Sequence, residues 1–273
     1  MRTIASLVLG WCLACPLWGA APQEKRPRSR REYDLFIQVL KTPDAAARLP
    51  LLDQWTEEYP ETDYLDERAR FYVDAYFKTG QVQKAVDAAR RVLRTSPDHF
   101  QFAFVLAALA PFAGPSDPGL RQDAGAAARV ILAWESRRPA SNTMQGEAKK
   151  GIRYLAHQCL GWVALENKDA PAAEQEFLQA LDSDPTAAQG SRWLSDAVLS
   201  QGDPAKNTLG LFSLARAASY DGENSLSDSE RQEATTQLER AYKERVSDNP
   251  QELQELIRAA RQSALPPPSF RIP

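Results

Sequence analysis

The chain has 273 residues, of which 43% are hydrophobic and 25% are charged, and this size suits one large domain or one repeat array. Its formal net charge at pH 7 is −3, so its overall field favours neither nucleic acid nor an anionic membrane. Composition therefore excludes a strongly basic nucleic-acid-binding chain. It indicates a folded protein whose function must be inferred from its sequence motifs and predicted secondary structure.

The N-terminal segment, residues 1–21, has the pattern of a cleaved export signal. Arg2 is followed by an apolar run over residues 4–18, too short to span a bilayer as a helix, and by small residues at 19–21. Signal peptidase accepts small residues before its cut, so we expect cleavage near 19–21. The sequence thus predicts a signal peptide at 1–21 and an exported protein of the periplasm or cell envelope. An uncleaved membrane anchor is the alternative.

Two of the three cysteines lie inside this signal. Cleavage would leave Cys159 alone, so the mature chain would have no internal disulfide and would be stabilised by packing. Cys15 follows Leu13 and Ala14, an order similar to a lipoprotein signal, but Cys12 stands where that motif has leucine. A lipid-anchored assembly factor, attached through Cys15, is therefore a further alternative.

The two ends of the mature chain have compositions that disfavour folded elements. Residues 22–31 (PQEKRPRSRR) are basic, contain proline and have almost nothing to bury, which predicts a disordered linker. Residues 264–273 are predicted to form a Pro-rich extended tail. We expect this tail to lie as a strap over the last helix, because Phe270 can bury its ring there.

Between these ends, residues 32–263 have helical patterning. Apolar residues recur with spacings of three and four, as at Ile152, Leu155, Ala156, Cys159, Leu160, Val163 and Ala164, and period-two alternation is absent. Helical patterns are interrupted by glycines or polar residues and closed by prolines, at Gly80, Gly202, 167–170, Pro60, Pro97, Pro139 and Pro185. We therefore expect antiparallel helix pairs, about a dozen helices in all.

Some helix boundaries are specified locally. Ser227 and Glu230 have the spacing of a capping box, and Asn249 is placed to cap the last helix. Pro50 is expected to kink or restart the helix predicted over residues 42–59.

Small residues occupy regular positions over residues 154–185. Gly161 lies on the first helix of a pair, and Ala173 and Ala180 lie on the second, where their size lets the two axes approach closely. Phe177 fills the volume beside them, and Pro185 ends the second helix.

This pattern resembles the tetratricopeptide repeat (TPR), whose period is about 34 residues. A second match covers residues 66–97 and has Ala85 and Ala89 at packing positions. The chain departs from the family at His157, where Trp is frequent, and at Val73, where Gly is found. As a whole it is similar to exported bacterial TPR-containing proteins of undefined function. The resemblance implies an all-α, right-handed α-solenoid with a concave groove that binds peptides or proteins.

Catalytic and metal-binding patterns were not found in the sequence. His99 and His157 are far apart along the chain, and neither has a second ligand at metal-binding spacing. Cys159 belongs to an apolar stripe without a flanking cation, which predicts a buried, inert thiol. No phosphate-binding glycine loop or nucleophile elbow occurs. We therefore expect a protein that is not an enzyme and that uses no cofactor or metal.

In the TPR family, the groove is lined by first-helix side chains that do not point into the core. The resemblance places these residues there: Arg70, Asp74, Phe77 and Lys78 in one repeat, Gln158, Trp162 and Glu166 in the next, and Arg192 and Asp196 in a more divergent pair. Trp162 stands out because it lies off the apolar stripe and Trp is a favoured binding anchor. The alternative is that a neighbouring repeat covers it.

The charges of this face restrict its ligands. They are mixed, which argues against nucleic acid. Arg70 and Asp74 stand where some family members have a Lys and an Asn that clamp a terminal carboxylate, so an acidic C-terminal peptide is not expected.

The leading hypothesis is a non-catalytic protein–protein interaction scaffold of the bacterial cell envelope, which binds a protein or extended peptide in its groove. The rival is an envelope enzyme or enzyme subunit that acts on cell-wall glycan with an Asp/Glu pair as acid and base. An enzyme predicts a deep pocket with two carboxylates, whereas a scaffold predicts an open groove with Trp162 exposed.

Overall fold

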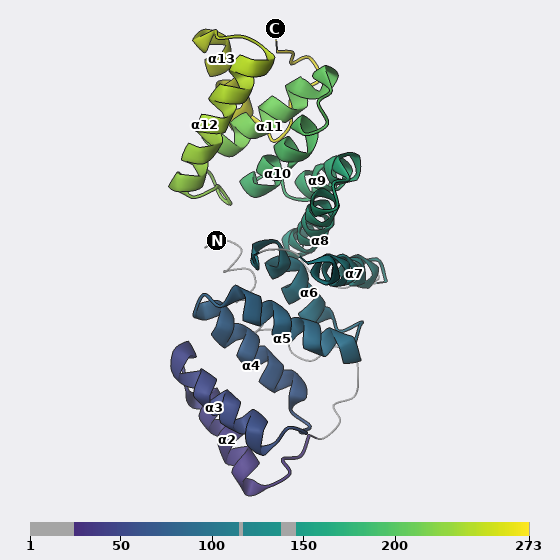
Figure 1. Cartoon of the computed structure of the whole chain (residues 1–273), viewed down its shortest axis with the longest axis vertical. Helices are drawn as coiled ribbons and strands as arrows, with labels where there is room; N and C mark the ends of the chain where they lie inside the picture. The colour runs from purple at the N-terminus through teal and green to yellow at the C-terminus, as the bar shows by residue number, and fades with distance from the viewer. Residues whose placement is uncertain (1–24, 115–116, 138–145, 273) are drawn as a thin grey trace. The chain divides into compact units, whose positions relative to one another are not determined.

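The computed structural model describes residues 25–114, 117–137 and 146–272, and the predicted signal peptide therefore lies outside the described residues. Within these ranges the chain forms twelve α-helices, labelled α2 to α13, and two short 3₁₀ turns, without a strand (Figure 1). This confirms the predicted all-α fold. No helix in the described ranges has both the length and the apolar character needed to cross a membrane.

The chain divides into two compact units, and the division falls inside α7, between Asp123 and Ala124. The first unit contains α2 (Arg30–Lys41), α3 (Ala45–Glu58), α4 (Leu65–Lys78), α5 (Val82–Thr95), α6 (Phe100–Leu109), the turn η1 (Ala110–Phe112) and the start of α7 (Pro118–Ser136). The second contains the rest of α7, α8 (Gly146–Glu166), α9 (Ala170–Ser183), α10 (Ala188–Leu199), η2 (Pro204–Lys206), α11 (Asn207–Ser219), α12 (Asp228–Arg245) and α13 (Pro250–Gln262). The predicted repeat domain, residues 32–263, thus comprises two units.

Local signals start and stop these helices as the sequence indicates. Ser227 and Glu230 form the predicted capping box of α12, and Asn249 caps α13 by accepting a hydrogen bond from the backbone N–H of Gln251. Gly80 and Gly202 follow α4 and α10 with φ of 75° and 69°, a conformation that disfavours side chains with a Cβ and ends each helix.

Helix α3 continues through Pro50, so the proline does not restart the helix. Leu52 and Trp55 are fully buried in the core of the first unit, together with Leu35 and Val39 of α2. Burial of these side chains offsets the backbone hydrogen bond that the proline cannot make.

A close helix contact in the second unit lies between α8 and α9. A Cβ atom added at Gly161 would lie 2.5 Å from a ring carbon of Phe177, so only glycine fits there. Ala173, Phe177 and Ala180 are all fully buried. Small residues thus permit the close approach of the two helices, as predicted. The equivalent alanines of the other repeat, Ala85 and Ala89, are also fully buried, on α5.

The last two helices, α12 and α13, both pack on α11. Leu238 and Tyr242 of α12 and Leu256 of α13 share one buried cluster with Phe212 of α11. Phe270 of the tail joins this cluster, with its ring 5.3 Å from that of Phe212. Phe270 is thus partly buried, as expected, but its ring contact is with α11 and not with the last helix, α13.

Two buried arginines join helix ends to their neighbours. Arg68 donates hydrogen bonds to the carbonyl oxygens of Tyr59 and Pro60, at 2.6 and 3.0 Å, and so holds the connection that follows α3. Arg216 donates to the carbonyl oxygen of Arg261 at 2.6 Å and stacks on Tyr220, so it holds the end of α13 against α11. Carbonyl groups that lack partners within their helices are thereby satisfied.

Candidate functional site

In the first unit, the predicted groove residues lie on α4, and one of them is part of the core. Asp74 is only 8% exposed and accepts a hydrogen bond from Arg48 of α3 at 2.6 Å. Lys78 pairs with the same carboxylate, at 2.9 Å, and Arg70 pairs with Glu67 at 3.4 Å. The prediction that Asp74 faces a ligand is therefore wrong, because its charge is neutralised by a buried partner from the preceding helix.

The other α4 candidates remain at the surface. Phe77 is partly buried, and Lys78 is exposed. Phe77 thus contributes part of an aromatic ring to the surface, and Lys78 contributes a cation that is already paired with Asp74 of the same helix.

On α8, the structure corrects the central expectation. Trp162 is only 7% exposed and Gln158 only 3% exposed, so neither side chain lines an open groove. Both continue a line that starts at the buried Leu155, with steps of three and four residues. This line is a second buried stripe on α8, which is why Trp162 lies off the first stripe and is still covered. Glu166, at the end of the helix, is exposed.

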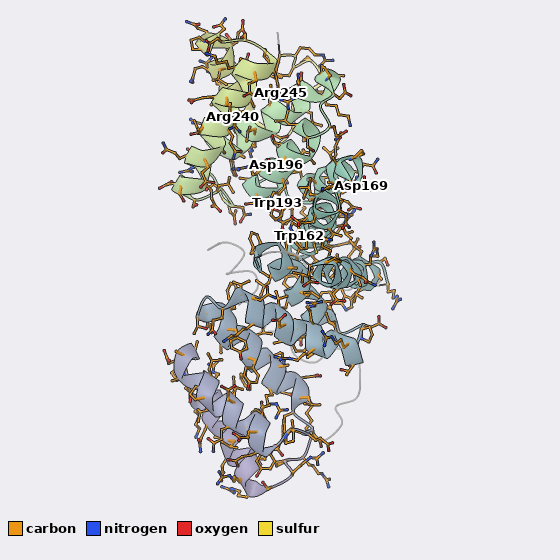
Figure 2. All side chains as sticks on the ribbon, viewed as in Figure 1. Trp162, Asp169, Trp193, Asp196, Arg240 and Arg245 are labelled. Carbon is orange, nitrogen blue, oxygen red and sulfur yellow. The ribbon has the colours of Figure 1, made fainter. Side chains whose placement is uncertain are left out.

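Helix α10 carries the clearest surface face among the predicted groove residues. Gln189, Arg192, Trp193 and Asp196 follow the steps i, i+3, i+4 and i+7 and are all partly or fully exposed. Figure 2 labels Trp193 and Asp196 on this helix, together with Trp162 on α8. Sequence analysis found Arg192 and Asp196 but missed Trp193, although its position one residue after Arg192 on the same face was a usable signal.

The α10 face, defined as these four residues, is held in place by the core beneath it. The ring of Trp193 lies 5.8 Å from that of the fully buried Phe177 on α9. Phe177 in turn lies directly against Gly161. The contact that sets the spacing of α8 and α9 therefore also positions the aromatic side chain of the face.

Electrostatics on the α10 face are set by partial desolvation. Arg192 approaches Asp196 at 3.9 Å, and its buried Nε atom has no hydrogen-bond partner. Half of the Asp196 side chain is exposed, yet desolvation by the surrounding helices raises its pKa, against the opposing charge of Arg192. The face thus combines a buried donor that lacks a hydrogen-bond partner with a half-exposed carboxylate whose pKa is raised.

The charge of Arg192 also reaches α12. Burial tends to raise the pKa of Glu230, but hydrogen bonds with Ser227 and the charge of Arg192 lower it below its usual range. Arg192 therefore interacts electrostatically with carboxylates on two helices, at Asp196 and at Glu230.

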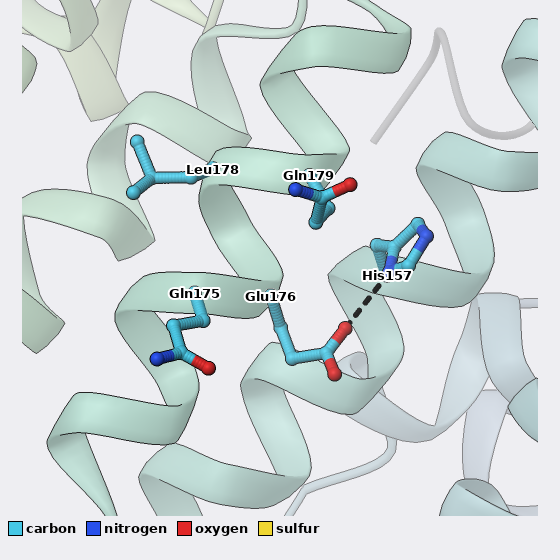
Figure 3. A pocket seen from close by; sticks show the side chains of 5 residues that line it. All are labelled: His157, Gln175, Glu176, Leu178 and Gln179. Atoms are coloured by element: carbon cyan, nitrogen blue, oxygen red, sulfur yellow. Dashed lines mark hydrogen bonds and ion pairs between the residues drawn. The ribbon is translucent and has the colours of Figure 1, made fainter.

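A shallow depression lies between α8 and α9. Figure 3 shows its lining residues, His157, Gln175, Glu176, Leu178 and Gln179. His157 Nδ1 lies 2.8 Å from Glu176 Oε2, so this histidine forms a hydrogen bond between the two helices. The depression contains one carboxylate, so it lacks the acid–base pair that the glycan-hydrolase hypothesis requires. Within the described ranges, no three His, Cys, Asp or Glu side chains are grouped so that they could hold a metal ion.

These features define the class of protein: an all-α helical-repeat protein whose hairpins are similar to those of TPR proteins. The class rests on the hairpin contacts themselves, above all the glycine, alanine and phenylalanine packing of α8 and α9.

Comparisons with known proteins place the chain beside two solved structures. One is TTC0263, a thermophilic TPR protein in Thermus thermophilus, with 17% identity and a TM-score of 0.43 over 77% of this chain and 97% of that chain. The other is the MamA RS-1 ArsTM double mutant, with 16% identity and a TM-score of 0.42 over 81% of this chain and 100% of that chain. No family model and no curated protein matches the sequence.

Proposed function

We propose that this protein is a non-catalytic interaction scaffold that binds an extended segment of a partner protein along the α10 face. The observation that supports the proposal best is the combination, on one turn and a half of helix, of a Trp positioned by the core, a partly exposed Arg and a half-exposed carboxylate. Trp and Arg are the side chains most often found to dominate binding energy at protein interfaces.

The chemistry of the face suits a peptide backbone. An extended segment presents alternating N–H and C=O groups, which match the Asp196 carboxylate as acceptor and the Arg192 guanidinium as donor. Because half of the Asp196 side chain is exposed, a peptide N–H group could reach its carboxylate and replace water there. Because the helices are already packed, binding would require little reorganisation of the scaffold.

We place this activity in the periplasm or cell envelope, on the pattern of the N-terminal segment, residues 1–21. Fractionation and mass spectrometry of the mature N-terminus would test export and cleavage near residues 19–21. Retention of the protein by membranes, lost on Cys15→Ser, would instead favour the lipid-anchored alternative.

Binding is tested with two double variants that are matched in residue type and spacing. Gln189→Ala with Asp196→Ala removes both ends of the α10 face, and Gln175→Ala with Asp182→Ala removes the same pair, also seven residues apart, from the exposed surface of α9. Peptides selected on the wild-type chain from a random library are titrated against both variants by fluorescence anisotropy.

We expect the α10 variant to lose at least about tenfold in affinity, equivalent to about 1.4 kcal/mol, and the α9 variant to match the wild type. Equal affinity of the two variants for every selected peptide would exclude the α10 face. Failure of the selection to yield any peptide above background would count against the scaffold function itself.

A further inference from the structure

Two short segments of the first unit carry opposite charge. The basic segment, residues 25–31, contains five Lys or Arg residues and no acidic residue. The acidic edge, residues 58–67, contains five Asp or Glu residues and no basic residue. It comprises the end of α3, the connection that follows and the start of α4.

The basic segment lies along the acidic edge in antiparallel order. Three ion pairs join them: Lys25 with Glu67 at 2.6 Å, Arg28 with Glu61 at 3.3 Å, and Arg31 with Glu58. Two further contacts fall between these pairs: the backbone N–H of Arg26 donates to Asp63 at 3.3 Å, and the hydroxyls of Ser29 and Tyr59 lie 2.6 Å apart. The predicted disordered linker is thus in contact with the folded unit from Lys25, and α2 already begins at Arg30.

The paired basic residues recur every third position, at 25, 28 and 31. Arg31 lies in the first turn of α2, so only Lys25 and Arg28 belong to the segment that precedes the helix. A polyproline II segment has about three residues per turn, and Pro27 favours that conformation, so the spacing suits placement of these two side chains on one side. The acidic edge therefore meets two basic side chains at a defined spacing, as well as a concentration of positive charge.

The acidic edge is a preformed platform. Arg68, which is buried, holds the carbonyl oxygens of Tyr59 and Pro60 from beneath. Thr62 is also buried, and its hydroxyl accepts a hydrogen bond from the backbone N–H of Tyr64 at 3.1 Å. These contacts keep the backbone of the edge in place whether or not the basic segment is bound.

The ion pairs themselves are exposed and so can be displaced. The side chains of Arg28 and Glu61 are 52% and 82% exposed, and that of Arg31 is 65% exposed. Exposed pairs of this kind are individually weak and are screened by salt. What holds the segment is mainly its covalent attachment, which keeps its local concentration high.

We propose that the acidic edge is a binding site for extended basic segments with the spacing Lys-x-x-Arg, and that residues 25–28 occupy it in cis as a displaceable strap. The site takes its specificity from the order of Glu67, Asp63 and Glu61 along the platform, whereas Glu58 remains paired with Arg31 of α2. It lies on different elements from the α10 face, so each site stands or fails without the other.

The test compares the full-length wild type with an opened variant that has Lys25→Ser, Arg26→Ser and Arg28→Ser. The probe is a fluorescein-labelled synthetic peptide, PQEKRPRSRR, which has the sequence of residues 22–31. Binding is followed by fluorescence anisotropy at low and at high salt. A peptide of the same composition, with the three-residue spacing scrambled, serves as the specificity control.

We expect the opened variant to bind the probe at least about tenfold more tightly than the wild type, because the competing strap has been removed. Addition of Glu61→Gln and Glu67→Gln to the opened variant should abolish this gain. Addition of Glu239→Gln and Glu244→Gln, which removes two exposed charges from α12, should leave it unchanged. High salt and the scrambled peptide should both weaken binding.

Each other result overturns the proposal. If the opened variant binds the probe no better than the wild type, the strap does not occupy the site. If the pairs of Glu→Gln changes have equal effects, or the scrambled peptide binds equally well, the edge attracts charge without recognising a segment. Circular dichroism spectra of all variants at the same salt confirm that the fold is intact.

Discussion

Replacement of Gly161 by Ala tests whether the close contact of α8 and α9 determines the stability of the second unit. The added methyl carbon would lie 2.5, 2.7 and 2.8 Å from three ring carbons of Phe177, whereas carbon atoms in contact are ordinarily about 3.5–4.0 Å apart. Phe177 is fully buried, so its ring has little room to move. Overpacking of this kind costs about 1–3 kcal/mol, and three close contacts favour the upper part of that range.

The same substitution also has a favourable term, since Ala is about 1 kcal/mol better than Gly inside a helix. Gly151→Ala isolates this term, because Gly151 lies on the same helix and its added Cβ would meet nothing within 4 Å. Gly151→Ala should therefore stabilise the chain by about 1 kcal/mol, and Gly161→Ala should destabilise it by about 1–2 kcal/mol.

Urea denaturation followed by far-UV circular dichroism measures both free energies of unfolding. The difference between the two variants, about 2–3 kcal/mol, is the steric cost alone. Phe177→Leu in the Gly161→Ala background should recover part of it, since the smaller side chain removes the ring. A Gly161→Ala variant as stable as Gly151→Ala would refute the close contact and the helix pairing built on it.

Three further predictions concern buried or desolvated groups. Arg216→Met should lower the free energy of unfolding by about 1–3 kcal/mol, because the carbonyl groups that Arg216 satisfies at the end of α13 lose their donor. Arg258→Met, at an exposed position of the same helix, is the control and should change the free energy of unfolding little in the same urea denaturation. Burial raises the pKa of the Cys159 thiol to about 12. In a chain whose other cysteines are replaced by serine, this thiol should therefore resist alkylation at pH 8 and react only after unfolding. Rapid labelling of the folded chain would contradict its burial. Desolvation raises the pKa of Asp196 in the folded chain, so its contribution to stability is present below its ordinary pKa and is lost as pH rises through the raised value. Asp196→Asn should therefore stabilise the protein at pH 7 and have no such effect under acid conditions. Thermal melts of the variant and the wild type from acid pH to pH 7 measure this difference. A variant that is less stable than the wild type at pH 7 would mean that the carboxylate is favourably paired.

Helix existence was predictable from the sequence because its determinants are close together along the chain. The capping box at Ser227 needs only Glu230 three residues later, and the end of α10 needs only Gly202. The fit of Gly161 to Phe177 was also predictable, since the repeat pattern relates these two positions across the turn that joins their helices. Each of these signals can be read from the sequence without knowledge of the rest of the fold.

The surface residues were less predictable. Trp162 and Trp193 are both tryptophans on first helices, yet one is buried and the other partly exposed. The helical stripe says which side chains share a face, but whether that face is covered depends on elements distant in sequence. The candidate site accordingly moved from α8 to α10.

The sequence by itself determined the helices, their ends and the small residues at the α8–α9 contact, because propensity, capping and three-and-four spacing act over a few residues. Only the tertiary structure decided that Asp74 is a buried ion-pair partner and that the basic segment lies along the acidic edge. Both depend on contacts between charged residues that are 26 or more positions apart in the sequence, and no local sequence pattern predicts such contacts.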